Sequence, residues 1–296
     1  MILKKHQKAF SLVELSMVIL IIGILIAGVS QGIDLYGDFK LASARNLTSG
    51  SIVARVPNLS MWWETTAENS FVNPKPNDGE LINQWNDINS QRAMKINLLN
   101  APNDASRPAY KASAINGLPA LKFSNAQNLR SADIKGDSFF SNNEITVFLV
   151  QNSTGGSDST MSWIPTNNNL DSGTQVSRLN FHLPHDNQFF FDFGGRITYS
   201  GSNAYNNKNT IFSFKRVGGE MIMRLNGQEI ASNSLITDNI INSHISPFVV
   251  GKMRIDSNYH FEGLIGEIII YGSCLGNNEI QKIESYLSKK WGIKIN

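Results

Sequence analysis

Residues 8–33 read KAFSLVELSMVILIIGILIAGVSQGI, and this stretch decides the N-terminal architecture. No residue from Leu15 to Ile33 is charged, and about 20 consecutive apolar residues are enough for a helix to cross a bilayer. Lys4, Lys5 and Lys8 precede the apolar run. Because such lysines stay on the cytoplasmic side of a membrane, we expect residues 1–9 to remain in the cytoplasm and the rest of the chain to be exported.

A secretory signal peptide has the same order of basic and apolar segments and is the main alternative. Two features argue against it. The apolar run is longer than the usual signal core, and Glu14 lies near its start, where a carboxylate in lipid costs roughly a few kcal/mol. Such a carboxylate is retained where it has a partner, so Glu14 is a candidate functional residue.

The segment from Lys8 to Glu14 resembles the processing site of type IV prepilins. In that family a small residue precedes the cleaved bond, an aromatic residue becomes the N-methylated N-terminus, and a glutamate is fifth in the mature chain. Ala9 (where glycine is commoner), Phe10 and Glu14 occupy these places. The resemblance implies cleavage between Ala9 and Phe10 by a prepilin peptidase. It also implies subunit assembly through Glu14, whose carboxylate is stabilised by the α-amine of a neighbouring subunit. A plain signal anchor remains the other interpretation.

The helical pattern continues beyond the apolar run. Leu35, Phe39 and Ala42 recur at i, i+4 and i+7, the spacing of one helix face. A helix from Phe10 to about Val53 would be about 65 Å long at 1.5 Å per residue, and Pro57 ends the pattern. We therefore predict a leader at residues 1–9, a transmembrane and amphipathic helix at 10–55, and one domain at 57–296.

The exported part has the composition of a β-sandwich. Residues 57–275 are rich in Asn, Ser and Gly and contain short β-type runs at residues 144–150, 210–217, 221–225, 247–250 and 264–271. Asn226-Gly227 predicts a two-residue hairpin turn between two strands. Many short strands with turn signals, and no alternation of strands with helices, predict a mainly β jelly-roll sandwich.

A C-terminal helix is predicted to close the sandwich. Its apolar stripe consists of Ile280, Ile283, Leu287 and Trp291. Asn277 or Asn278 is the expected N-cap, and Gly292 is the expected stop. Lys290 neighbours the stripe, and we expect it on the solvent side.

This exported part resembles the concanavalin A-like, laminin-G-like superfamily as it occurs in bacterial surface proteins. The matching segments are residues 58–63, 85–87, 107–110, 116–123 and 261–292. The resemblance implies a lectin-like sandwich over residues 57–296. It leaves calcium open as a ligand, because some members hold it between Asp- and Asn-rich loops such as residues 155–158 and 167–171.

Composition excludes several functions. The 296 residues carry a net charge of +2, so nothing global indicates nucleic-acid binding. The single cysteine, Cys274, cannot form an intramolecular disulfide and is interpreted as a small apolar residue near a strand end.

No motif indicates catalysis or a metal site. His182 and His185 offer two metal ligands without a third, so we interpret them as solvated imidazoles at a turn. Phe189, Phe191 and Phe193 alternate as the core face of a strand would, although a sugar-stacking platform is the alternative. Polysaccharide hydrolysis would need two close carboxylates, and Glu262 and Glu267, five residues apart, would face opposite sides of a strand.

The sequence thus predicts a non-enzymatic type IV pilin-like subunit, minor or tip-located, whose lectin-like domain mediates adhesion. Expected partners are a prepilin peptidase, other pilin or pseudopilin subunits, and a glycan or surface protein. The expected location is the bacterial inner membrane with the C-terminal domain in the periplasm, and the cell surface or pilus after assembly. A structural pseudopilin of a type II secretion system is the alternative, and a polysaccharide-active enzyme is the third hypothesis.

Overall fold

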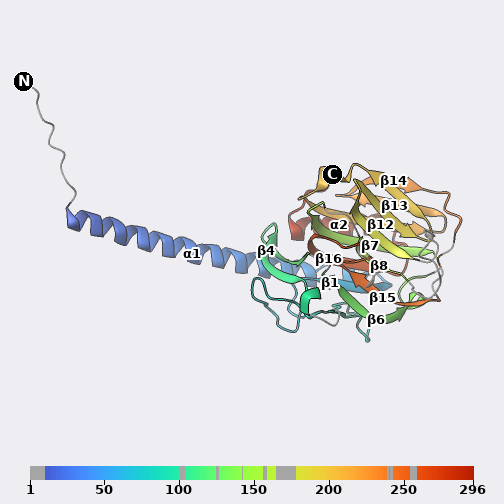
Figure 1. Ribbon diagram of the computed structural model, residues 1–296, viewed down its shortest axis with the longest axis horizontal. Coiled ribbons are helices and arrows are strands. Elements are labelled where there is room, and N and C mark those ends of the chain that lie inside the picture. Colours follow the sequence, from blue (N-terminus) through green and yellow to red (C-terminus); the bar gives the residue numbers. More distant parts are fainter. Residues whose placement is uncertain are drawn as a thin grey trace, which may run out of the picture.

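The computed structural model describes residues 11–100, 104–124, 127–141, 143–155, 159–164, 178–238, 240, 243–253 and 259–296. A long helix, α1 (Leu12–Ser49), leads into a β-sandwich that is followed by helix α2 (Asn277–Trp291) (Figure 1). The architecture predicted from the sequence is therefore confirmed. The predicted cleavage site between Ala9 and Phe10 lies outside the described residues.

Helix α1 begins with a capping box. The Ser11 hydroxyl accepts the Val13 amide at 3.2 Å, and the Glu14 carboxylate accepts the Ser11 amide at 2.9 Å. The α-helix ends at Ser49, four residues before the predicted end, and Val53–Arg55 form a separate 3-10 turn. The reason is tertiary: Val53 is fully buried, and its carbonyl accepts the Tyr271 hydroxyl at 2.8 Å.

The strands form two antiparallel sheets. In the first, sheet A, the order is β14 (Gln228–Asn233), β13 (Glu220–Leu225), β12 (Asn209–Val217), β7 (Glu144–Ser153), β16 (Gly263–Tyr271), β5 (Leu118–Phe123) and β4 (Ala109–Ile115), and β1 (Leu59–Glu64) pairs with β16. In the second, sheet B, the order is β11 (Arg196–Ser200), β10 (Gln188–Phe193), β9 (Leu179–His185), β8 (Ser159–Trp163), β15 (Ile245–Val250), β6 (Leu129–Lys135), β3 (Leu98–Asn100) and β2 (Gln84–Trp85).

The central strands of sheet A, β1, β16 and β7, are buried on both faces. The inner face of sheet A meets sheet B in a core that includes Trp63 and Ile268, and its outer face meets α1 and α2 in a second core that includes Trp62 and Ile269. Successive side chains of a strand point to opposite faces. Of two adjacent residues, such as Trp62 and Trp63, one therefore packs in each core. This explains why β1 and β16 are almost continuously apolar, as strands covered on both faces are.

Turn residues behave largely as the sequence predicted. Asn226 and Gly227 both have positive φ, 48° and 81°, and join β13 to β14, which confirms the hairpin. Gly292 adopts the left-handed conformation after α2. The predicted N-cap is wrong by one or two residues: Gly276 is the cap, and its amide is held by the Glu279 carboxylate at 2.9 Å.

Candidate functional site

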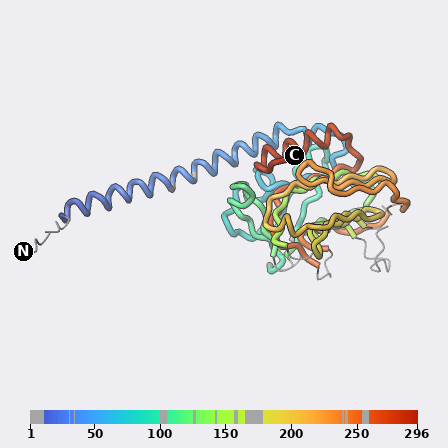
Figure 2. Tube along the Cα trace, turned by 90° about the horizontal axis from the view of Figure 1, so that it is seen from above, coloured from blue at the N-terminus to red at the C-terminus, as the bar shows by residue number. Residues whose placement is uncertain are grey.

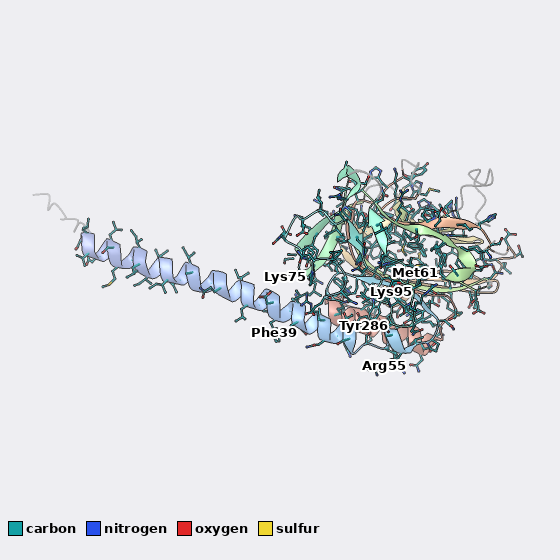
Figure 3. The ribbon with its side chains drawn as sticks, turned by 90° about the horizontal axis from the view of Figure 1, so that it is seen from below. Phe39, Arg55, Met61, Lys75, Lys95 and Tyr286 are labelled. Carbon is teal, nitrogen blue, oxygen red and sulfur yellow. The ribbon has the colours of Figure 1, made fainter. Side chains whose placement is uncertain are left out.

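The N-terminal part of α1, from Leu12 to Phe39, is apolar and largely uncovered by the rest of the described chain, apart from an exposed ion pair between Asp38 and Lys75 at 2.8 Å. Its side chains project freely along the helix (Figure 3), and Leu12 and Phe39 are 85% and 70% exposed. It is long and apolar enough to cross a membrane, with a mean hydropathy of 2.7 in its best window. Glu14 contacts the start of its own helix through Ser11. Its pairing with a neighbouring α-amine remains a prediction.

The last turns of α1 are part of the domain. They run alongside α2, as Figure 2 shows. Ala44 and Thr48 are buried, and the Thr48 hydroxyl lies 3.3 Å from the Tyr286 hydroxyl. Arg45 donates through Nε to the Thr66 carbonyl at 2.8 Å and through Nη1 to the Glu68 carboxylate at 3.1 Å. These contacts attach the helix to the β-sandwich.

Beneath this contact lies a buried charge cluster. Lys290 Nζ is 2.8 Å from Glu64 Oε2, 2.9 Å from Glu267 Oε2 and 3.2 Å from the Tyr286 hydroxyl. The side chains of Lys290, Glu64 and Glu267 are 0% exposed. Removing one partner of such a cluster would leave an uncompensated charge, which costs about 3–5 kcal/mol.

Neutral hydrogen-bond donors also stabilise the two carboxylates of the cluster. Glu267 accepts hydrogen bonds from Trp62 Nε1, Trp291 Nε1 and the Tyr286 hydroxyl, each at 2.8 Å, and Glu64 accepts the Thr66 amide at 2.6 Å. The pKa of Tyr286 is raised well above its ordinary value, first by burial and then by Glu267, so this hydroxyl remains a donor. The cluster ties β1, β16, α2 and α1 into one unit.

Two sequence interpretations are corrected here. Lys290, expected on the solvent side, is 4% exposed, because α2 turns it toward sheet A. From the sequence, Glu262 was considered as the partner of Glu267 in a carboxylate pair. In the structure the carboxylate beside Glu267 is Glu64, its direct neighbour across the β1–β16 ladder. No local signal could reveal the cluster, since Lys290 and Glu64 are 226 residues apart. Because neither carboxylate is exposed, the cluster is structural.

The histidines lie on the outer face of sheet B, away from the core between the sheets. The centroids of the His182 and His185 rings are 5.2 Å apart, and each lies 5.8 Å from that of the Phe190 ring. His182 is 6% exposed, so the prediction of a solvated imidazole is wrong for it. Burial lowers the pKa of His182 to about 4, and the ring is therefore neutral near pH 7. Phe189, Phe191 and Phe193 lie in the core, as the alternation predicted.

The described residues contain no group of three metal-ligating side chains. The loops considered for calcium, residues 155–158 and 167–171, lie outside the described residues except for Gly155. Cys274 is half-buried, and burial raises the pKa of its thiol, which keeps the weakly nucleophilic protonated form.

Comparison with known proteins gives one family match. Residues 4–30 match the prokaryotic N-terminal methylation motif. This match covers Ala9, Phe10 and Glu14 and lies within the leader and the exposed half of α1. No curated protein matches the chain.

Solved structures resemble the sandwich at low identity. The botulinum neurotoxin serotype G binding domain is 13% identical with a TM-score of 0.51, over 78% of this chain and 51% of that one. The serotype D binding domain is 14% identical with a TM-score of 0.51, over 79% and 52%. An arabinofuranosidase complexed with arabinofuranosyl-α-1,2-xylobiose is 11% identical with a TM-score of 0.52, over 71% and 51%.

The chain thus spans about half the length of each of these three structures. At such identity the likeness shows the fold alone. The ligand of this chain therefore has to be argued from its own residues. The motif and the exposed apolar helix support membrane anchoring. This chain therefore carries a prepilin-type methylation motif on a membrane-capable helix, joined to an antiparallel β-sandwich.

Proposed function

We propose that this protein is a type IV pilin-like subunit, minor or tip-located, that displays its lectin-like domain outside the inner membrane for adhesion. One observation carries the proposal. The methylation motif at residues 4–30 opens a helix whose first half is uncovered and whose last turns are built into the sandwich. In such a protein the helix that enters the membrane or filament is rigidly attached to the exported β-sandwich.

The uncovered half of α1 needs an apolar environment. Large side chains on all sides of it are about half or more exposed, from Leu12 to Phe39, and contiguous apolar surface of this extent marks a membrane or protein contact. Lipid supplies that environment before assembly, and helices of other pilin or pseudopilin subunits supply it afterwards. Glu14, which lies near the start of the apolar run, then meets the methylated amine of Phe10 from a neighbour.

We propose a binding role and no enzymatic one for the exported domain. Glycoside hydrolysis needs two carboxylates that flank a substrate. The close pair Glu64 and Glu267 is fully buried beneath α2 and shares Lys290, so no sugar reaches it. Binding of a glycan or surface protein requires only the rim and outer surfaces of the sandwich.

N-terminal mass spectrometry and microscopy test this function together. We expect the mature chain to begin with N-methylated Phe10, and antibodies to the domain to label filaments or their tips. A mature chain that starts at Ser30 or Gln31 would instead indicate an ordinary signal peptidase. If deletion of the gene blocked protein secretion and left adhesion intact, the pseudopilin alternative would hold.

A further inference from the structure

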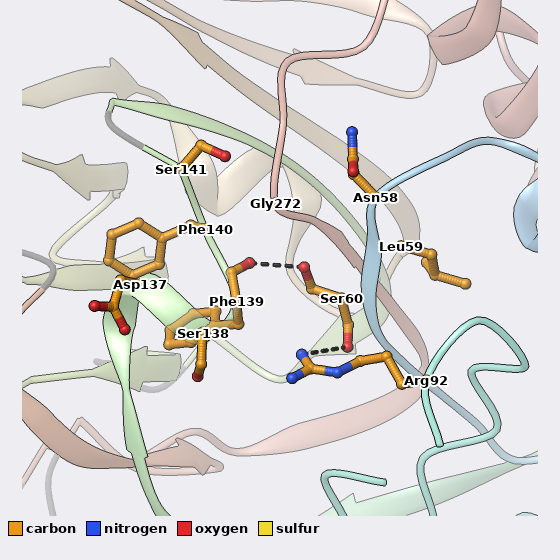
Figure 4. Close-up of a pocket in the computed structure, with 10 residues that line it drawn as sticks. All are labelled: Asn58, Leu59, Ser60, Arg92, Asp137, Ser138, Phe139, Phe140, Ser141 and Gly272. Atoms are coloured by element: carbon orange, nitrogen blue, oxygen red, sulfur yellow. Dashed lines mark hydrogen bonds between the residues drawn. The ribbon is translucent and has the colours of Figure 1, made fainter. Parts of the chain in front are cut away.

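A polar pocket lies at the rim of the sandwich, away from the buried charge cluster and the histidines. It is a shallow, open hollow of about 450 Å³ between the start of β1, the end of β16 and the segment 137–141, which begins within the 3-10 turn η3 (Gly136–Ser138). Figure 4 shows Arg92 and Asn58 beside β1, and Ser138 and Ser141 on the segment opposite. The volume falls within the range of small-molecule sites, about 300–1,000 Å³.

Arg92 is the unusual residue of this pocket. Its single hydrogen bond among the described residues runs from Nη1 to the Ser60 carbonyl at 3.4 Å, close to the limit of such a bond. Four other arginines of the domain are engaged: Arg178 and Arg196 by Asp192, Arg224 by Glu284, and Arg216 by backbone carbonyls. Arg92 is half-buried, so most of its donors lie at the pocket without an acceptor among the described residues.

No carboxylate among the described residues is ion-paired with Arg92. Asp137, the carboxylate that lines the pocket, is 2.6 Å from Lys135. Ser60 fixes the wall by donating to the Phe139 carbonyl at 2.7 Å. Ser141 is held by its amide, which donates to the Gly272 carbonyl at 2.9 Å, and no hydrogen bond of its hydroxyl is recorded among the described residues. The pocket therefore combines the Arg92 cation with hydroxyl and amide groups, and its one carboxylate among the described residues, Asp137, is paired with Lys135.

We propose that this pocket binds the carboxylate of an acidic sugar unit, such as a uronate. Arg92 takes the carboxylate, because a planar guanidinium matches its two oxygens and forms charge-assisted hydrogen bonds. Asn58, Ser138 and Ser141 face the sugar hydroxyls. The inference rests on the proposed binding function and adds the ligand class and its site.

The test measures binding of trigalacturonate, and of the same trimer with its carboxyl groups methyl-esterified, to the full-length protein in detergent. We expect the wild type to bind the acid at least 10-fold more tightly than the ester. Arg92→Met should weaken acid binding at least 10-fold and leave ester binding unchanged. Arg92→Lys, which keeps the charge and loses the planar fork, should fall between. Arg55→Met, on an exposed arginine outside the pocket, should match the wild type.

The outcomes separate this site from the wider function. Equal affinity for acid and ester, or an unchanged affinity in Arg92→Met, overturns the site. If the domain binds neutral glycans alone, the site is overturned and the adhesive function stands. If neither trimer binds, the site is also overturned, and filament labelling still decides the pilin function. Melting temperatures should be equal across the variants, because Arg92 makes one weak bond, so a folding defect is detected separately.

Discussion

The two halves of α1 differ in where their stabilising partners lie. From Leu12 to Phe39 the helix exposes apolar side chains to its surroundings, whereas Ala44, Thr48 and the following Val53 are buried against α2 and sheet A. The chain itself therefore stabilises the C-terminal part of the helix, whereas the N-terminal part leaves an uncovered apolar surface that supports membrane anchoring. Figures 2 and 3 show both halves on one continuous helix.

The charged groups differ in the same way. Glu14 is exposed and bonded to the start of its own helix, while Glu64 and Glu267 share Lys290 in the buried interior. A carboxylate in an apolar environment needs a partner in either case. Substitutions at the two sites should therefore affect different properties, assembly at Glu14 and folding at Lys290.

The largest effect is expected for Glu14→Val. Incorporation into filaments should fall sharply, because the neighbouring α-amine loses its counter-charge, while membrane insertion should be kept or improved, since a desolvation cost is removed. Quantifying the subunit in sheared filaments and in membranes measures both. Leu15→Val, an apolar replacement next to it, is the control. Normal incorporation of Glu14→Val would remove the proposed role of this residue.

Lys290→Met should destabilise the domain by about 3–5 kcal/mol, because two buried carboxylates lose their cation. Lys289→Met, at the exposed neighbouring position, should change the free energy of unfolding by less than about 0.5 kcal/mol. Denaturant unfolding of both variants checks the difference. Similar stabilities would mean that the cluster does not hold α2.

Trp291→Ala should also cost about 3–5 kcal/mol. The indole is fully buried, donates to Glu267, and packs where a Cβ on Gly266 would come within 2.5 Å of its ring. Thermal unfolding measures the loss, with Lys289→Ala as the matched control on the same helix. A melting temperature equal to that of the control would contradict the packing of α2 on sheet A.

A truncated domain that starts at residue 57 should be soluble and mainly β, and less stable than one that starts at residue 40. The shorter chain lacks Val53 and Val56, both buried in the second core, and fully burying one valine is worth about 1.5–3 kcal/mol. Circular dichroism and melting temperatures of the two chains compare them. Equal stability would place the boundary of the folded unit at residue 57, as the sequence predicted, and would make the contact with α1 dispensable.

The smallest effect is expected for Thr48→Val. This change keeps the shape of the side chain and removes the contacts of its hydroxyl with the Tyr286 hydroxyl at 3.3 Å and with the Ala44 carbonyl at 3.1 Å, which should cost about 1–2 kcal/mol. Ser49→Ala on the exposed side of the same turn is the control. A loss well above that of these two hydrogen bonds would show that the joint between α1 and the charge cluster is more cooperative than pairwise contacts imply.

Local patterns in the sequence were sufficient to predict several of the helices and turns. The uncharged run from Leu15 to Ile33 predicts the membrane-capable helix, the Asn226-Gly227 pair predicts its hairpin, and the stripe of α2 predicts its buried face. Each depends on neighbours within a few residues, because helix and strand periodicities are local. The methylation motif is equally local, which is why seven residues were enough to suggest the leader.

Tertiary structure alone decided which polar groups are buried. Lys290 looks like a solvated end of α2, and it is buried because the chain brings Glu64 and Glu267 beside it from 226 and 23 residues away. The same holds for Arg92, which stands at a pocket formed by β1, β16 and η3. A charge is retained in a protein interior only where a partner and donors converge, and that convergence depends on the path of the whole chain rather than on any local pattern.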